Sequence, residues 1–446
     1  MPTRTNAKTA NDIIAFFRMK LIGMQLFAGA TDIDTPKFSD SLMSTKITKC
    51  RSVGLVCPSR HESWLGGLYH LQHLILAARS LPVPERLTFR DIWWNEQAPG
   101  KDPFLEVRAN IGAPLELRLP SDLYGRLARR VRRIVHGKRS KGLADIFQTA
   151  GIDLLFPLLP CDHIGIPFVG WITDFQYKHL SAYYTEELQQ AHDDDNIRIA
   201  RQATLIMLSS SAAESDMRKF FPQLASRARV VRPCSVPTPD WWTLDPRAVA
   251  QRLGLPDRFF LISNTICRHK NHRTVFEALR ILRDKGLHAN IVCTGKKEDY
   301  RDPLFFPDLV RSVRDSRLEG QIHFVGSVPR SEHIALLRQC VAVVQPSEFE
   351  GWGFSISDAK ALGKNILASD IPVHHEHCAP RTTFVPTHDP YVWAEALTRL
   401  WLTGNQGPDP LAEEEALLVS ELEASRVGRE LASLFDEACT LGVNRD

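Results

Sequence analysis

Short apolar runs rich in β-branched residues alternate with amphipathic stretches along most of the chain. This alternation is typical of βαβ units, which build a parallel sheet covered by helices on both faces. The strands expected in the first half are 52–57, 87–93, 115–119, 152–156, 168–172, 204–208 and 228–231. Those expected in the second half are 259–263, 290–293, 322–325, 341–344 and 365–368. The pattern therefore predicts an α/β fold with two doubly wound parallel-sheet domains.

A proline-rich segment separates the two series of strands. Residues 233–246 contain four prolines and the pair Trp241–Trp242, which favours an interdomain linker. A long acidic helix is expected over 411–438, with apolar residues on one side. The predicted inward residues of this helix are Leu417, Leu418, Leu422, Val427, Leu431, Leu434 and Phe435. The expected organisation is an N-terminal extension (1–48), a first domain (49–235), a linker (236–250), a second domain (251–405) and a C-terminal helical segment (406–446).

Composition fits a folded globular protein, with 446 residues of which 43% are hydrophobic and 24% charged. The formal charge of +3 argues against an extended nucleic-acid-binding face, so no nucleic acid is expected as a partner. Residues 1–235 carry 31 Lys and Arg against 23 Asp and Glu, whereas residues 236–446 carry 24 against 29. We therefore expect domains of opposite charge, with the acidic terminal helix lying against the basic first domain.

Two segments favour contact with a membrane surface. Residues 13–28 have apolar positions at helical spacing but include Arg18 and Lys20, which predicts an amphipathic helix that does not span a bilayer and either docks on the domain or lies in a membrane interface. Residues 126–141 hold eight basic residues and no acid, which fits either an anionic membrane or a solvated helix face. The nine cysteines include no Cys-x-x-Cys pair, so a reducing cytoplasmic location is expected, at the inner face of the membrane if these segments bind it.

The segment 346–370, PSEFEGWGFSISDAKALGKNILASD, carries the clearest chemical pattern. It follows an apolar strand, passes a turn that contains Gly351 and Gly353, and enters a helix. Ligands of open α/β sheets bind beyond the carboxyl ends of the strands, where glycines allow close approach and a helix N-terminus favours an anionic diphosphate. Glu350 and Asp358 can both accept hydrogen bonds from sugar or ribose hydroxyls in one cleft.

This segment resembles the Glu-x7-Glu signature of retaining family-4 glycosyltransferases. The resemblance implies the GT-B fold, with two facing Rossmann-like domains and a C-terminal helix that crosses back to the first. It also implies that Glu350 contacts the donor sugar and that Asp358, one methylene shorter than the family's Glu, contacts the nucleotide ribose. Further residues are assigned to the donor pocket by the same resemblance, namely Gly351, Trp352, Gly353, Phe354, Asn264, Gly295 and, in the loop 324–329, Val328.

A second segment, 259–279, runs from a strand through a basic loop into a helix. Cationic side chains at this place suit a diphosphate. In the family an Arg and, five residues later, a Lys neutralise the leaving nucleoside diphosphate. Lys270 matches that Lys, whereas Thr265 occupies the Arg position and Arg268 is the nearby substitute.

The first half contributes candidates to the other side of the cleft. Gly66 and Gly67 precede a helix and form either a tight turn or a loop close to phosphate or acceptor. The segment 168–179, FVGWITDFQYKH, resembles the family's WIxDFQxxH form, which brings Asp174 and His179 to the cleft. Asp174 has either a substrate role or a buried capping role.

The run HHEH at 374–377 is expected to be extended, so its histidines do not converge on a metal, and Glu376 is retained as a polar site residue. The resemblance implies transfer of a hexose-type sugar, with retention, from a nucleotide-sugar donor to a saccharide or lipid-linked acceptor in cell-surface polysaccharide or glycolipid synthesis. No metal and no other cofactor is expected. A sugar-nucleotide epimerase, a phosphorylase and a catalytically idle scaffold subunit of the same fold stay open as alternatives.

Overall fold

The computed structural model describes residues 49–56, 65–94, 104–117, 141–158 and 165–443. The predicted extension over 1–48, which includes the segment 13–28, lies outside the described residues, as does nearly all of the basic segment 126–141. Residues 47–446 form one unit.

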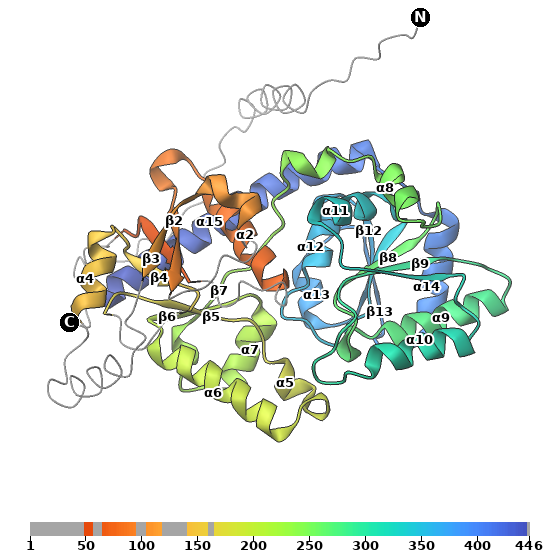
Figure 1. Ribbon diagram of the computed structural model, residues 1–446, viewed down its shortest axis with the longest axis horizontal. Coiled ribbons are helices and arrows are strands. Elements are labelled where there is room, and N and C mark those ends of the chain that lie inside the picture. The colour runs from red at the N-terminus through yellow and green to blue at the C-terminus, as the bar shows by residue number, and fades with distance from the viewer. Residues whose placement is uncertain (1–48, 57–64, 95–103, 118–140, 159–164, 444–446) are drawn as a thin grey trace, which may run out of the picture. The chain divides into compact units, whose positions relative to one another are not determined.

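The described ranges of the first domain, drawn in Figure 1, contain seven parallel strands. They form two sheets, in the orders β3-β2-β1-β4 and β5-β6-β7, and a parallel bridge between Leu155 and Phe168 connects them. The strands are β1 Ser52–Leu55, β2 Thr88–Trp94, β3 Ile111–Leu117, β4 Leu154–Phe156, β5 Val169–Ile172, β6 Leu205–Leu208 and β7 Ala228–Val230. The helices are α2 Leu65–Arg79, α4 Lys141–Thr149, α5 Gln176–His179, α6 Glu186–Gln202 and α7 Ser211–Phe220. The strand β3 begins four residues before the predicted run.

The second domain has one six-stranded parallel sheet in the order β10-β9-β8-β11-β12-β13. Its strands are β8 Phe260–Ser263, β9 Ile291–Thr294, β10 Ile322–Gly326, β11 Ala342–Gln345, β12 Asn365–Ser369 and β13 Thr382–Val385. Its helices are α8 Pro246–Arg252, α9 His272–Asp284, α10 Phe305–Asp315, α11 Arg330–Gln339, α12 Phe354–Ala361, α13 Pro372–Glu376 and α14 Pro390–Thr403. The helix α8, which begins inside the predicted linker and ends two residues beyond it, packs against α11, and Trp241 is buried beside it.

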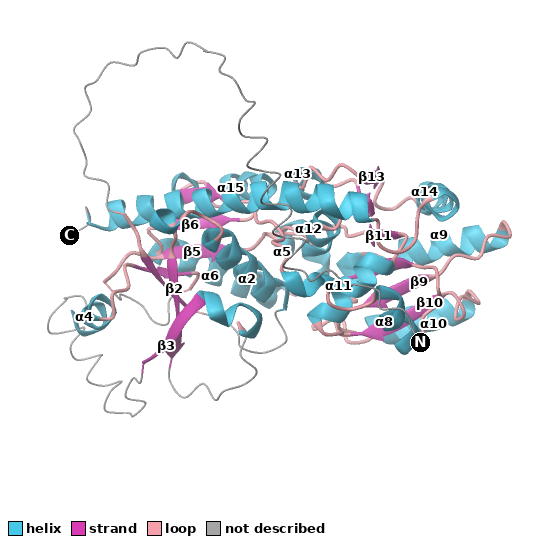
Figure 2. Ribbon diagram, turned by 90° about the horizontal axis from the view of Figure 1, so that it is seen from above, coloured by secondary structure: helices cyan, strands magenta, loops and turns pink. Residues whose placement is uncertain are grey.

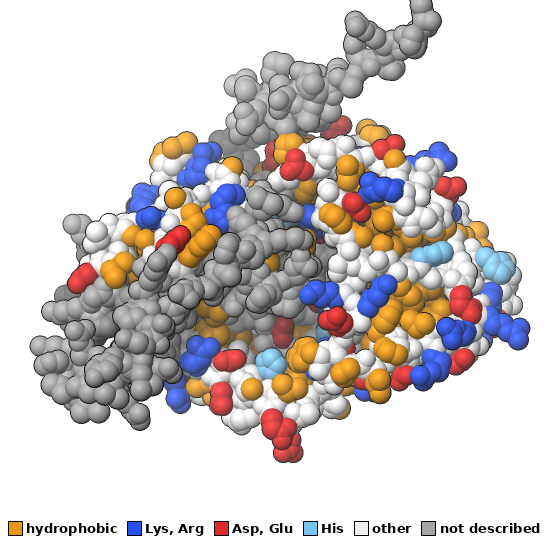
Figure 3. Space-filling view, in the orientation of Figure 1, with side chains coloured by type: hydrophobic (Ala, Val, Ile, Leu, Met, Phe, Trp, Pro, Cys, Tyr) orange, Lys and Arg blue, Asp and Glu red, His pale blue; other side chains and the backbone are white. Residues whose placement is uncertain are grey.

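Alternation along β8 explains why both faces of this sheet are covered. Phe260 and Ile262 belong to the apolar cluster formed with α9 and α14, whereas Leu261 belongs to the cluster formed with α11 and α12. A parallel strand buried on both faces reads as a continuous apolar run, as this one does. On the face shown in Figure 3, Lys and Arg side chains of this domain are interspersed with Asp and Glu side chains.

The helix α15, Pro410–Val443, passes along both domains (Figure 2). It contacts α12 in the second domain and α2 and β4 in the first, as the predicted crossover requires. Three of its carboxylates pair with basic side chains of the two domains. These pairs are Glu413 with Arg338, Glu423 with Lys360 and Glu437 with Arg229.

The buried stripe in the first half of α15 consists of small residues, which differs from the prediction. Leu418 and Leu422 were expected to face inward, but they are 39% and 73% exposed. Small buried residues repeat every four positions instead, namely Ala412, Ala416, Ser420, Ala424 and Gly428. Small side chains let the helix backbone approach its neighbours closely. None of the helices in the described ranges is both long and apolar enough to cross a bilayer.

We expect Gly428→Val to lower the free energy of unfolding by at least about 2 kcal/mol, because a larger side chain overpacks a tight contact. A Cβ at this position would lie 2.4 Å from the carbonyl oxygen of Ala77 in α2. Urea denaturation followed by tryptophan fluorescence measures the change. The control is Glu421→Val, at an exposed position of the same helix, which should cost well under 1 kcal/mol. Equal effects of the two substitutions would contradict a close α2–α15 contact.

Candidate functional site

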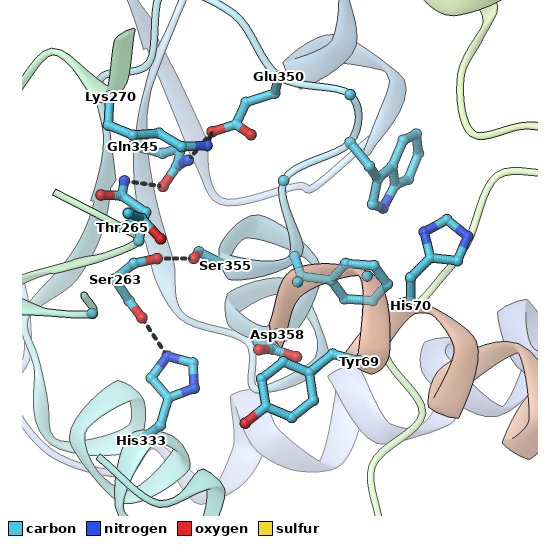
Figure 4. A pocket seen from close by; sticks show the side chains of 18 of the residues that line it. Tyr69, His70, Ser263, Thr265, Lys270, His333, Gln345, Glu350, Ser355 and Asp358 are labelled. Atoms are coloured by element: carbon cyan, nitrogen blue, oxygen red, sulfur yellow. Dashed lines mark hydrogen bonds and ion pairs between the residues drawn. The ribbon is translucent and has the colours of Figure 1, made fainter. Parts of the chain in front are cut away.

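A cavity of about 440 Å³ lies beyond the carboxyl ends of strands from both domains. Figure 4 shows side chains that line it. Most of the predicted site residues do so, namely Glu350, Lys270, Asp174, Asp358, Gly351, Trp352, Gly353, Phe354, Asn264, Gly295, Val328, Gly66 and Gly67. Arg268, His179 and Glu376 are not part of its wall.

An ion pair between Lys270 and Glu350 forms one wall of the cavity. Lys270 Nζ donates to Glu350 Oε1 at 2.6 Å, and Gln345 Nε2 and Ser347 Oγ donate to the same oxygen at 2.6 and 2.7 Å. Burial by itself would raise the pKa of Glu350, but the Lys270 ammonium and these hydrogen bonds lower it below its usual value. Glu350 is therefore ionised, and no described residue donates to its Oε2.

The turn after Glu350 lies directly against the first domain. A Cβ on Gly351 would come within 2.8 Å of the Thr173 carbonyl oxygen and 3.1 Å of the Asp174 side chain. Only glycine leaves room for this close approach to Thr173 and Asp174, which directly follow β5 of the first domain. The closeness of the two domains at this point explains why the cavity has walls from both.

Asp174 is buried in the cavity wall, and its Oδ1 accepts a hydrogen bond from the backbone N–H of Gln176 at 2.9 Å. Burial raises the pKa of Asp174, and the nearby Glu350 carboxylate adds to the increase. The sequence left open whether Asp174 has a capping role or a substrate role. Its carboxyl group makes the capping hydrogen bond, and the residue also lines the cavity.

Asp358 forms an ion pair with Arg330, and both residues line the cavity. Its Oδ2 accepts from Arg330 Nη1 at 2.5 Å, and its Oδ1 accepts from Arg330 Nη2 at 2.7 Å and from Ser235 Oγ at 2.6 Å. The side chain is only 1% exposed. Burial would raise the pKa of Asp358, but Arg330 holds it at about 2. The carboxylate expected to contact ribose therefore already has a bidentate partner.

Sequence reasoning missed Arg330, which begins α11 and is itself almost fully buried. Its guanidinium lies 4.8 Å from the ring centre of Tyr69 and 5.1 Å from that of Trp241, so it stacks between residues of the first domain and the interdomain segment. His333 lies one turn further along α11, and its Nε2 forms a hydrogen bond with Ser263 Oγ at 2.6 Å. The signal that could have found Arg330 is its place immediately after the loop 324–329, already assigned to the donor pocket.

Arg268 and His179 lie outside the cavity, at contacts between the domains. The exposed Arg268 side chain stacks on Tyr183 of the first domain at 4.7 Å. His179 Nε2 lies 2.7 Å from Asp216 Oδ1, and its ring packs against Phe349 of the second domain. To contact the donor or acceptor as predicted, Arg268 would have to leave Tyr183 in the other domain, and His179 would have to leave Asp216 on α7.

Glu376 links the second domain to the first. Its carboxylate accepts hydrogen bonds from the backbone N–H groups of Ser211 and Ala212, at 2.7 and 2.9 Å, and from Arg232 Nε at 2.8 Å. It thus caps the N-terminus of α7, where a negative charge is favoured by the helix dipole. The run HHEH was expected to be extended, but it continues the short helix α13, because Pro372 fixes a helical first turn. Across the described ranges, no group of three or more His, Cys, Asp and Glu side chains is arranged to hold a metal ion.

Comparison with known proteins finds a family match over the second domain. Residues 249–408 match the family model described as glycosyl transferases group 1. A stretch of 156 residues is 26% identical to the O-antigen chain mannosyltransferase RfbU of Salmonella typhimurium and covers 35% of this chain and 41% of that protein. A stretch of 102 residues is 32% identical to the N,N'-diacetylbacillosaminyl-diphospho-undecaprenol alpha-1,3-N-acetylgalactosaminyltransferase of Campylobacter jejuni and covers 23% of this chain and 24% of that protein. The chain thus spans less than half the length of these curated relatives.

Similarity to solved structures extends over both domains. HepE of Anabaena, solved with UDP and glucose, has a TM-score of 0.57 at 16% identity, over 86% of this chain and 98% of that one. A glycosyltransferase of Rickettsia africae has a TM-score of 0.58 at 15% identity, over 87% and 98%. At this identity the likeness concerns the fold, and it confirms the predicted GT-B architecture. Residues 249–408 therefore match the glycosyl transferases group 1 family, within a chain that has the two-domain GT-B fold.

Proposed function

We propose that the protein is a retaining glycosyltransferase that moves a hexose-type sugar from a nucleotide-sugar donor to a saccharide or lipid-linked acceptor. The observation that carries the proposal is the buried Lys270–Glu350 pair at the meeting of the two domains. The pair offers a cation to a diphosphate and an ionised carboxylate to sugar hydroxyls within one cavity.

The positive groups around the cavity suit a nucleoside diphosphate. Lys270 and Lys296 line it, and so do Gly66 and Gly67 in the first turn of α2. The free backbone N–H groups of a helix N-terminus bind anions. These groups would hold the diphosphate and stabilise the negative charge that develops on it as the sugar departs.

This placement supports a displacement on one face of the donor sugar. The acceptor hydroxyl oxygen forms a bond to the anomeric carbon on the face from which the nucleotide leaves, while the bond from that carbon to the phosphate oxygen breaks. The bonding electrons go to the departing diphosphate, and the hydroxyl proton passes to one of its oxygens. The protein therefore supplies orientation and charge stabilisation and needs no strong base.

The names of the relatives favour an acceptor of cell-surface polysaccharide synthesis. One relative is named for O-antigen chain transfer and another for a diphospho-undecaprenol substrate, which is lipid-linked. A lipid-linked acceptor would bring this protein to a membrane surface. An epimerase or a phosphorylase of the same fold would not release nucleoside diphosphate in response to an added saccharide acceptor, and an idle scaffold would bind no nucleotide.

We expect one nucleoside diphosphate among UDP, GDP and ADP to raise the unfolding temperature, because a ligand that binds only the folded state stabilises it by mass action. Lys270→Ala should weaken its affinity about 10- to 100-fold, as loss of a charge-assisted hydrogen bond does. Calorimetric titration measures both dissociation constants. Lys285→Ala, at an exposed position of the same domain, is the control. Failure of all three nucleotides to bind would contradict the proposal and favour a scaffold.

Glu350→Gln should reduce the rate of sugar transfer by about 100-fold or more. The neutral amide no longer stabilises the positive charge that develops on the sugar in the transition state. The rate is measured as acceptor-dependent release of nucleoside diphosphate from the nucleotide sugar that binds best. Glu395→Gln, an exposed change on α14, should leave the rate unaltered. An unchanged rate in the Glu350 variant would rule out the proposed role of this carboxylate.

The depressed pKa of Asp358 predicts a pH dependence of stability. Its folded-state pKa of about 2 lies below the unfolded value of 3.8, so ionisation contributes stability that is fully present above pH 4 and is lost as the pH falls toward 2. Asp358→Asn should therefore destabilise the protein most at neutral pH, and its difference from the unaltered protein should narrow by about 2 kcal/mol between pH 4 and pH 2. Urea denaturation at a series of pH values tests this, with the exposed Asp315→Asn as control. A difference that stays constant over this range would contradict it.

A further inference from the structure

His70 is a wall residue of the cavity to which neither the sequence nor the family match assigns a role. It lies near the start of α2, five residues after its first residue, and is only 2% exposed. Its ring lies 4.1 Å from Trp171 and 5.5 Å from Phe354, measured between ring centres. Figure 4 shows its side chain beside the cavity, on the side opposite Lys270. Packing from both domains thus fixes the orientation of this imidazole.

The Nε2 atom of His70 is buried and has no hydrogen-bond partner. A buried polar atom left without a partner costs about 1–3 kcal/mol and calls for an explanation. Three other histidines in the described ranges share this property, namely His272, His323 and His374. None of those three lines the cavity. His70 does line the cavity, so a ligand that fills the cavity would lie beside the ring that carries this unpartnered nitrogen.

The state of the imidazole limits what it can bind. Burial and the neighbouring His73 lower the pKa of His70 to about 3, so the ring is neutral in ordinary buffers. A neutral ring nitrogen either donates or accepts one hydrogen bond, according to its tautomer, and so matches a hydroxyl better than a phosphate.

The contact between His70 and Phe354 indicates which part of the ligand would lie nearest to His70. Phe354 begins α12 and directly follows the turn 350–353, which we assign to the donor sugar. Trp171 and Phe354 also present apolar surface next to the imidazole. A sugar, with hydroxyls at its edge and apolar faces, complements this combination.

We propose that His70 Nε2 forms a hydrogen bond with a hydroxyl of the donor sugar and so helps to determine which sugar is accepted. This inference rests on the proposed function, since it requires a nucleotide-sugar donor in the cavity. It assigns His70 to sugar recognition, whereas Lys270 and the helix N-termini are assigned to the diphosphate.

The test compares a nucleotide sugar with the matching nucleoside diphosphate by calorimetric titration, using UDP-glucose, UDP-N-acetylgalactosamine and GDP-mannose against UDP and GDP. His70→Phe keeps a buried aromatic ring but removes both ring nitrogens, including Nε2. It should weaken binding of the preferred nucleotide sugar about 3- to 10-fold, the effect of losing one hydrogen bond, and leave binding of the nucleoside diphosphate unchanged. His70→Gln, which keeps a polar group near the Nε2 position, should recover most of the loss.

Thermal unfolding without ligand supplies a second readout. His70→Phe removes no hydrogen bond of Nε2 in the free protein, so its unfolding temperature should equal or exceed that of the unaltered protein. The matched control is His323→Phe, which removes an unpartnered buried nitrogen outside the cavity and should leave sugar binding unaltered. Equal affinity of the His70→Phe variant for the nucleotide sugar, or equal weakening of sugar and diphosphate binding, would overturn the inference. If the unaltered protein binds no nucleotide at all, the proposed function itself fails.

Discussion

The ion pair between Lys270 and Glu350 is the interaction on which the cavity depends. Both side chains are largely buried, at 15% and 8% exposure, so each charge would be costly without the other. They follow β8 and β11, which are neighbours in the sheet, and their contact therefore joins two loops at one sheet edge. It keeps Glu350 ionised and holds the start of the glycine turn that meets the first domain. A nucleotide-sugar site at this edge would use a cation and a carboxylate already positioned against each other.

The strands of the second domain could be predicted closely because buried parallel strands are continuous apolar runs. The strand β13 was missed, since its four residues, Thr382–Val385, lie at the edge of the sheet and three of them are only partly buried. The inward face of α15 was predicted incorrectly at Leu418 and Leu422. A prediction from periodicity assigns large apolar residues to the buried face, whereas close packing of this helix requires small residues there, as at Gly428.

The candidate site divides in the same way. Glu350 and Lys270 could be placed from sequence because each follows a recognisable strand and precedes a helix. The pairing of Asp358 with Arg330 could not, because the two residues lie on different helices and meet only through the packing of α11 against α12. Arg268 shows a further limit, since its loop position was predicted but its side chain turns to Tyr183 in the other domain.

A crystal structure of the protein with the nucleotide sugar that binds most tightly would test the donor site most directly. The diphosphate should lie within hydrogen-bonding distance of Lys270 Nζ and of the backbone N–H groups at Gly66 and Gly67, with the sugar against the turn 350–353. A ligand bound elsewhere, for example in a cavity lined by Cys50 and by Asp436 and Leu441 near the end of α15, would contradict the assignment of the Lys270–Glu350 cavity as the donor site.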